Sequence, residues 1–440
     1  MNTPICDFLA EYATKNNVRL HMPGHKGIGD VEKHDLTEIE GADSLYEARG
    51  IIMKSEENAS RLFASHTLYS TEGSSLAIRA MLYLAMLTKA SGERATVLAG
   101  RNVHKVFVTA AALLDFDVEW LTGNGSYLSC RIEASEVDER LHSMTKKPLA
   151  LYLTSPDYLG NVADIHAISE VCKRHGVLLL VDNAHGAYLA FTEPSAHPIA
   201  LGADMCADSA HKTLPCLTGA AYLHIADTMP KQVKERAKSA LSLFGSTSPS
   251  YLILASLDKA NAYLANGYKE KLSAFTARLD ELKKELSSVG YEVVGNEPMK
   301  LTLMPKSYGY TGYELGAHLS KMGFVPEFSD PDFLVLMPTP EISDTELKGL
   351  LSALTALERR APITDTPPAP ALTERATSPR EAVLSFAERI AVENAEGRIL
   401  ADVTVGCPPA VPIVVSGERI SKEAIKAFKY YGIDFCTVVK

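Results

Sequence analysis

The amino-acid sequence predicts an α/β fold in which the largest domain is built on a mostly parallel sheet. From about Ser65 to Ile225, segments typical of strands alternate with segments typical of helices. This alternation indicates parallel strands that are covered by helices on both faces. The apolar run Val177–Val181 is typical of a strand buried inside such a sheet. After Pro249 the chain changes to long charged helices, which predicts a second, smaller domain.

The expected elements follow one another in a regular order. In the large domain, strands are predicted at Ala95–Ala99, Val118–Leu121, Leu149–Thr154 and Val177–Val181, and helices at Leu76–Leu87, Val103–Leu114, Glu133–Met144 and Ile165–His175. In the second domain, charged and apolar residues recur at helical spacing from Tyr268 to Leu286, which predicts a long helix. Further strands are expected at Lys300–Met304 and Phe333–Met337, and further helices from Gly312 and from Ser343.

Changes in composition divide the chain into five segments. The proline-rich stretch Ala361–Pro370 is typical of a linker between domains. We expect an N-terminal arm at residues 1–64, a large domain at 65–245, a small α+β domain at 246–360, the linker at 361–379 and a C-terminal α/β domain at 380–440.

The composition argues against several classes of protein. The chain has 440 residues, of which 46% are hydrophobic, so it can bury a full core. A net charge of −10 and the absence of a Lys/Arg-rich run argue against nucleic acid or an anionic membrane as a partner. No uncharged apolar stretch is long enough to span a bilayer, and the N-terminus lacks the pattern of a signal peptide. Seven cysteines without a C-x-x-C pair fit reduced thiols better than disulfides or structural zinc. We therefore expect a cytoplasmic protein without a metal site.

An acidic residue and a lysine follow two successive strands of the predicted sheet. Asp182 comes directly after Val177–Val181, and Lys212 comes after the next short strand. Ligands of open α/β sheets bind outside the carboxyl ends of the strands. A lysine can form a Schiff base with the aldehyde of pyridoxal phosphate (PLP), and a carboxylate can keep the pyridine nitrogen protonated. The pair therefore indicates PLP. The alternative is a strand-end Asp and a surface Lys that never meet.

A third feature fits the same cofactor. Gly73, Ser74 and Ser75 stand at the start of the apolar helix predicted at Leu76–Leu87. Free backbone N–H groups and the helix dipole make such a start a phosphate site. An ordinary serine N-cap is the commoner explanation of any single serine there. A phosphate cradle, a ring partner and a lysine in this chain order rarely occur together by chance.

Eight segments of the chain match a known pattern in family order. They are His21–Gly27, Ser70–Ser75, Arg101–Lys105, Thr154–Gly160, Val181–Gly186, Ser209–Leu214, Ser246–Tyr251 and Cys407–Pro412. On these motifs the chain resembles the PLP-dependent ornithine/lysine/arginine decarboxylase family of fold type I. The HxPGHK and SxHKT motifs are the specific ones. The resemblance implies a seven-stranded type of sheet, and the short form of the family without an N-terminal receiver-like domain.

The resemblance implies three catalytic residues. Lys212 would carry the Schiff base, and Asp182 would pair with the ring nitrogen. His104 would stack on the ring and could return a proton to the reacting carbon, although a lone histidine at a helix start is usually structural. The family often has Glu where this chain has Asn183, and a threonine where it has Ala210. Neither change removes the electron sink.

The resemblance also implies the residues that bind the cofactor. Gly73, Ser74 and Ser75 would bind the phosphate, and Ser209 and His211 would face the phosphate region. Ala184 would pack against the ring, although a core alanine explains it equally well. His185 would contact phosphate or substrate, and Thr247 or Ser246 would reach the phosphate of the neighbouring subunit. That last role implies a homodimer, or a higher assembly, with shared sites. His21, Pro23, His25 and Lys26 would line the site mouth or fix the N-terminal arm.

The expected reaction is α-decarboxylation of a basic L-amino acid to CO2 and agmatine or a diamine. Arginine or lysine is favoured as the substrate, and ornithine is possible. The distal cation needs an acidic partner in a desolvated pocket. The candidates are Asp43, Glu47, Asp157 and Glu327, although acidic residues on loops are mostly solvated. Cys206 and Cys216 flank Lys212 and could line the site, but buried, inert thiols are the simpler expectation.

Two other functions stay open at this point. An aminotransferase or another enzyme of the same fold would commonly hold the substrate carboxylate with an arginine in the small domain. Residues Lys300–Leu354 contain no arginine, which argues against that class. A non-catalytic paralogue would be expected to lose the lysine or the ring partner, and this chain has both.

Overall fold

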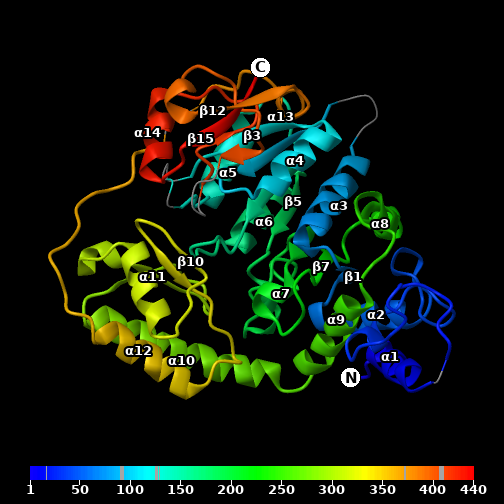
Figure 1. The fold of residues 1–440 in the computed structure, drawn as a ribbon. Helices are drawn as coiled ribbons and strands as arrows, with labels where there is room; N and C mark the ends of the chain where they lie inside the picture. Colours follow the sequence, from blue (N-terminus) through cyan, green and yellow to red (C-terminus); the bar gives the residue numbers. More distant parts are fainter. Residues whose placement is uncertain (16, 90–93, 124–126, 128, 371–372, 406–410) are drawn as a thin grey trace. The chain divides into compact units, whose positions relative to one another are not determined.

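The central feature of the fold is a seven-stranded sheet (Figure 1). The computed structural model describes the chain except for residues 16, 90–93, 124–126, 128, 371–372 and 406–410. The strand order is β1-β7-β6-β5-β4-β2-β3. β5 and β6 pair in parallel, as do β2 and β3, whereas β7 runs antiparallel to both of its neighbours. The predicted α/β fold with a mostly parallel sheet is confirmed.

The strands of this sheet are short and largely buried. They are β1 (His66–Ser70), β2 (Thr96–Gly100), β3 (Asp117–Leu121), β4 (Ala150–Thr154), β5 (Leu178–Asp182), β6 (Met205–Asp208) and β7 (Ala221–Ile225). The helices between and after them are α3 (Gly73–Leu87), α4 (Lys105–Leu114), α5 (Ala134–Ser143), α6 (Ile165–His175), α7 (Ala210–Thr213), α8 (Lys231–Phe244) and α9 (Tyr251–Leu264). The helices α1 (Pro4–Thr14) and α2 (Ile51–Phe63) precede them.

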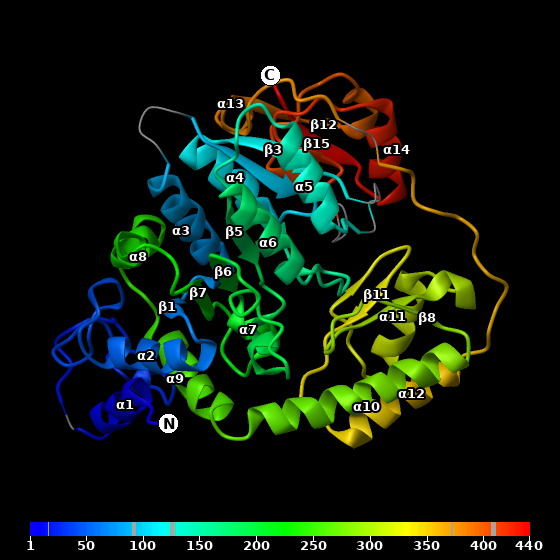
Figure 2. The same ribbon diagram turned by 180° about the vertical axis from the view of Figure 1, so that it is seen from behind.

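The described chain divides into two compact units. The first contains residues 1–95, 145–153 and 165–270. In it, α3 contacts β6 and β7 on one side and α8 on the other (Figure 2). The apolar side chains of Leu179, Leu180 and Val181 in β5 are fully buried, as expected for a strand inside a parallel sheet.

The second unit contains residues 96–144, 154–164 and 271–440. It includes most of the long helix α10 (Tyr268–Ser288) and a four-stranded antiparallel sheet in the order β10-β11-β9-β8. The elements around that sheet are β8 (Glu292–Val294), β9 (Leu301–Met304), α11 (Gly312–Lys321), β10 (Phe328–Ser329), β11 (Leu334–Leu336) and α12 (Asp344–Thr355). Capping boxes begin both α11, at Thr311 and Glu314, and α12, at Ser343 and Glu346.

The C-terminal part of the second unit contains two small antiparallel pairs, β12–β15 and β13–β14. Its elements are α13 (Pro379–Val383), β12 (Ala387–Ala391), β13 (Thr404–Val405), β14 (Val414–Val415), α14 (Lys422–Tyr430) and β15 (Phe435–Val439). A buried bidentate ion pair joins this part to the residue after β2, because the guanidinium of Arg101 lies 2.6 and 2.7 Å from the two carboxylate oxygens of Glu418.

The predicted elements are present, with small shifts at their ends. α4 begins at Lys105 rather than Val103, because His104 has extended backbone and its ring Nδ1 accepts the N–H of Val106 at 3.3 Å. The five-segment domain division stays a prediction. Among the described residues, no helix combines the length and the apolar character needed to cross a bilayer.

Candidate active site

Strand pairing brings Asp182 and the segment of Lys212 to the same edge of the sheet. Asp182 is the last residue of β5, and its Cα pairs with that of Ala207 in the neighbouring strand β6. β6 ends at Asp208 and leads through Ser209 into α7, which carries Lys212. Because β5 and β6 are parallel, their carboxyl ends face the same side, where ligands of α/β sheets bind.

The carboxylate of Asp182 is held in place by two donors. The side chain is 2% exposed, and its Oδ1 accepts the backbone N–H of Ala184 at 3.2 Å. Its Oδ2 accepts the hydroxyl of Tyr152, also at 3.2 Å. Burial and the charge of Asp182 raise the pKa of Tyr152 well above 10, so the phenol remains a donor. Both hydrogen bonds favour the ionised form of the carboxylate.

Lys212 lies beside a buried histidine. Its Nζ is 3.2 Å from Nε2 of His185, which is 5% exposed. The expected contact of His185 with phosphate or substrate stays a prediction. In the structure this imidazole is placed to share a proton with the lysine.

The start of α3 has the features of a phosphate site. Its N-cap residue, Glu72, makes no capping hydrogen bond with its side chain, so the serine N-cap considered above is not formed. The hydroxyl of Ser209 donates to Oγ of Ser74 at 2.8 Å, which joins this helix start to the segment before Lys212. Gly73 has a φ of +71°, and a Cβ added there would meet no atom within 4 Å. The N–H of Gly73 donates to the carbonyl of Gly219 at 2.7 Å. Open space beside the other N–H groups of the first turn and two hydroxyls suits a phosphate.

The remaining predicted site residues lie in different surroundings. Nδ1 of His211 donates to the carbonyl of Ala220 at 2.9 Å, Ala184 is buried, and Ser75 is half-buried in the first turn of α3. Thr247 is exposed. His104 is exposed and belongs to the second compact unit. The roles assigned to these residues stay predictions.

The N-terminal motif makes its hydrogen bonds with nearby residues. Nε2 of His21 lies 2.7 Å from the hydroxyl of Tyr12, and Nζ of Lys26 donates to the carbonyl of His21 at 2.6 Å. Nε2 of His25 lies 3.2 Å from a carboxylate oxygen of Asp35. These contacts favour the expected role in fixing the N-terminal arm. The last motif, Cys407–Pro412, lies outside the described residues from Cys407 to Ala410.

Three of the four acidic candidates for the substrate's distal group already accept hydrogen bonds from the protein. The carboxylate of Asp43 accepts backbone N–H groups at the start of α2, including that of Gly50 at 2.8 Å. The carboxylate of Asp157 accepts both the backbone and the side-chain N–H of Asn161 at 2.8 Å. Glu47 and Glu327 are exposed, and Glu327 accepts the hydroxyl of Tyr158.

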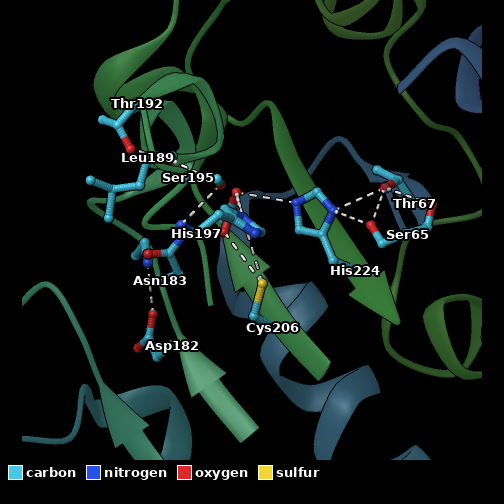
Figure 3. A network of polar contacts seen from close by, with 12 residues as sticks. Ser65, Thr67, Asp182, Asn183, Leu189, Thr192, Ser195, His197, Cys206 and His224 are labelled. Atoms are coloured by element: carbon cyan, nitrogen blue, oxygen red, sulfur yellow. Dashed lines mark hydrogen bonds and ion pairs between the residues drawn. The ribbon is translucent and has the colours of Figure 1, made fainter. Parts of the chain in front are cut away.

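Sequence reasoning missed a buried polar network behind the two strand ends. Oδ2 of Asp208 accepts Nε2–H of both His197 and His224 at 3.1 Å, and its Oδ1 accepts the amide of Asn183 at 2.7 Å. Figure 3 shows His197, His224 and Cys206 gathered in this network. Cys206 is fully buried there, which confirms the expectation of a buried thiol, whereas Cys216 is half-buried.

The charge state of this network follows from its burial. Burial alone would raise the pKa of Asp208, but His197 and His224 outweigh that effect and hold it well below its ordinary value. Burial lowers the pKa of His224 below 6.5, although Asp208 opposes the shift. Asp208 is therefore ionised at neutral pH, and His224 is neutral. In the sequence, the one feature that pointed to this network is that Asp208 directly precedes the SxHKT motif.

Comparison with solved structures confirms the fold. Lysine decarboxylase LdcF of Francisella novicida matches with a TM-score of 0.82 and 18% identity, over 100% of this chain and 81% of that one. This likeness shows that the chain has the same α/β fold as that structure.

Sequence comparison then gives the family. Residues 3–295 match the model described as Orn/Lys/Arg decarboxylase, major domain, and residues 359–434 match the C-terminal domain of the same family. Two proteins of Bacillus subtilis (strain 168) are each 30% identical. They are the uncharacterized protein YaaO, over 97% of this chain and 93% of its own length, and an arginine decarboxylase, over 96% and 92%. The chain belongs to the Orn/Lys/Arg decarboxylase family of PLP-dependent carboxy-lyases, which act on basic amino acids.

The described residues fit this cofactor. Lys212 would hold the aldehyde, Asp182 the ring nitrogen, and the start of α3 with Ser209 the phosphate. We predict that Lys212→Ala abolishes the visible aldimine band of the PLP-loaded protein, because the variant lacks the amine that forms the Schiff base. PLP that is bound without this bond absorbs at shorter wavelength. Absorption spectra of the wild type and the variant test this. Lys105→Ala serves as the control and should keep the band. A band that persists in Lys212→Ala would show that another lysine is the attachment site.

The buried network predicts an acid-labile fold. Because the folded pKa of His224 is depressed, its neutral form contributes stability above pH 6.5, and this contribution is lost as the pH falls further toward the folded pKa. We expect the melting temperature of the holoenzyme to fall between pH 7 and pH 5, and to fall less in His224→Gln. The exposed His142→Gln is the matched control. An unchanged pH dependence in His224→Gln would contradict this explanation.

Proposed function

We propose that this chain decarboxylates L-arginine to agmatine and CO2, with lysine as the second choice and ornithine as a further possibility. One observation carries the choice of arginine: a relative that is 30% identical over 96% of this chain is named an arginine decarboxylase. Asp182 ends β5, and Lys212 lies in α7 just after the end of the parallel neighbouring strand β6, which supports the chemistry.

PLP, when bound, supplies an aldehyde for the substrate amine and an electron sink for the charge left on the α-carbon as CO2 departs. The residues of this chain have three tasks in that reaction. Asp182 keeps a proton at the ring nitrogen, and its two hydrogen-bond donors fix the direction of its carboxylate. His185, 3.2 Å from Nζ of Lys212, accepts a proton from the ammonium group and leaves a nucleophilic amine. His104 is the proposed donor of the proton that replaces CO2.

Recognition of the distal guanidinium requires an acid with two free oxygens, because a planar guanidinium binds a carboxylate in bidentate fashion. Asp43 and Asp157 already bind groups of their own segments. Glu327 already accepts the hydroxyl of Tyr158 through one carboxylate oxygen, so Glu47 is the better candidate.

We predict that arginine gives the highest kcat/KM in a panel with lysine and ornithine, by at least about tenfold, or about 1.4 kcal/mol of transition-state binding. Released CO2 measures the reaction, and parallel assays with 2-oxoglutarate measure amino transfer. Lysine or ornithine as the better substrate would contradict the choice of arginine. Amino transfer without CO2 release would contradict decarboxylation.

We also propose a homodimer with shared active sites. Five large apolar side chains lie exposed in one N-terminal stretch, namely Val18, Leu20, Met22, Ile28 and Val31, at 83, 91, 68, 87 and 61% exposure. Large apolar side chains are unfavourable in water, so their exposure in one short stretch favours an interface with a partner. Thr247, the residue expected to reach the partner's phosphate, is also exposed.

The dimer is tested by sedimentation of the holoenzyme. We expect a mass of about twice the 47.7 kDa of one chain, or a multiple of that dimer. The double substitution Leu20→Asp with Ile28→Asp should shift the protein toward the monomer and reduce CO2 release in parallel. Val289→Asp, at an exposed apolar residue outside the stretch, is the control. A fully active monomer would rule out shared sites.

A further inference from the structure

Asp208 occupies a central place between the two strand ends. It is the last residue of β6, it is 0% exposed, and it directly precedes Ser209. Its carboxylate accepts N–H groups from the side chains of Asn183, His197 and His224. The thiol of Cys206 also donates to it, at 3.8 Å. A buried carboxylate is stable only when such donors replace water.

On one side, Asp208 fixes the end of β5. The amide of Asn183 donates to Oδ1 of Asp208 at 2.7 Å, and the backbone N–H of Asn183 donates to the carbonyl of Ala207 at 3.0 Å. Asn183 directly follows Asp182. These two bonds therefore hold the residue next to the ring partner against the end of the strand that leads to Lys212.

On the other side, Asp208 is anchored in the sheet. His224 lies in β7, and its Nδ1 accepts the hydroxyl of Thr67 in β1 at 2.9 Å. His197 follows the 3-10 helix Ala187–Phe191 and is 1% exposed. The carboxylate of Asp208 thus connects β6 with β7 and with the chain that follows β5, and His224 extends the network to Thr67 of β1.

We infer that Asp208 is a positioning residue. Through its bond to Asn183, it holds Asp182 and Lys212 at the relative positions that the cofactor needs. This inference rests on the roles proposed above for Asp182 and Lys212. It also explains why the chain has Asn rather than an acid at position 183. A carboxylate there would face that of Asp208 at 2.7 Å in a water-free interior, and one of the two would have to take up a proton.

A metal ion is the alternative use of the same atoms. Sγ of Cys206 lies 3.8 Å from Nε2 of His197 and 3.8 Å from Oδ1 of Asp208, and these residue types are common zinc ligands. No metal ion is needed to explain the positions of these side chains, because three N–H groups donate hydrogen bonds to the carboxylate of Asp208. We therefore treat bound metal as an outcome of the test.

The test exchanges the amide of Asn183 and the carboxylate of Asp208. Asn183→Asp should weaken PLP binding at least about tenfold, or about 1.4 kcal/mol, and should move the pH midpoint of the visible band, because two buried acids would then compete for one proton. Combining it with Asp208→Asn restores one amide and one carboxylate. The amide at position 208 can accept from both histidines and donate to the acid at 183. We expect this double variant to recover PLP affinity to within about threefold.

Ser55→Ala separates positioning from simple loss of stability. The Ser55 hydroxyl donates to the Asp258 carboxylate in another network of the same unit. This variant should lower the melting temperature of the cofactor-free protein while leaving the pH midpoint of the band unchanged. If Asn183→Asp behaves like Ser55→Ala, or if the double variant recovers nothing, the inference is wrong. Should the double variant not fold, Asp208→Asn alone decides, because unchanged PLP affinity and pH midpoint would overturn the inference.

Further outcomes distinguish a failure of this inference from a failure of the proposed cofactor site. A wild-type protein that forms no visible band with PLP, or a band that survives Lys212→Ala, would reject the site itself and the inference with it. One equivalent of zinc that is lost in Cys206→Ser would overturn the inference alone and assign the cluster to a metal.

Discussion

The parallel pairing of β5 with β6 is the constraint on which the site depends. It fixes Asp182 opposite Ala207, and therefore sets where the chain leaves β6 toward Ser209 and Lys212. Side-chain hydrogen bonds then fix the groups that this pairing brings together. The hydroxyl of Tyr152 binds Asp182, and that of Ser209 binds Ser74 at the start of α3, so that one sheet edge presents an acid, an amine and a helix start. These are the groups that we propose hold the cofactor: Asp182 at the ring nitrogen, Lys212 at the aldehyde and the start of α3 at the phosphate.

Much of this arrangement could be predicted from the sequence because it depends on local order. The helix at Ile165–His175 has the bounds that its pattern predicted, and the buried strand before Asp182 is shifted by only one residue. Chain order alone predicted that an acid and a lysine follow successive strands. The first residue of a helix was harder to predict. α4 begins at Lys105 because the ring of His104 caps it, and such a cap depends on a side chain rather than on periodicity.

The Asp208 network could not be predicted in this way, because its members meet only in three dimensions. His197 precedes Asp208 by eleven residues, and Thr67 reaches His224 only through the antiparallel pairing of β1 with β7. The same holds for Tyr152, which lies on a different strand from Asp182. Periodicity indicates which face of a strand is buried, but not which polar groups face one another inside. Asn183 illustrates this, since it departs from the family pattern and finds its partner in Asp208.

We propose that one lysine at the carboxyl edge of the sheet carries the cofactor. Borohydride reduction of the PLP-loaded protein, followed by proteolysis and mass spectrometry, tests it most directly, because reduction makes the lysine–cofactor bond permanent. The peptide that contains Lys212 should carry the added mass of the reduced cofactor. Attachment to a peptide from any other part of the chain would contradict the account.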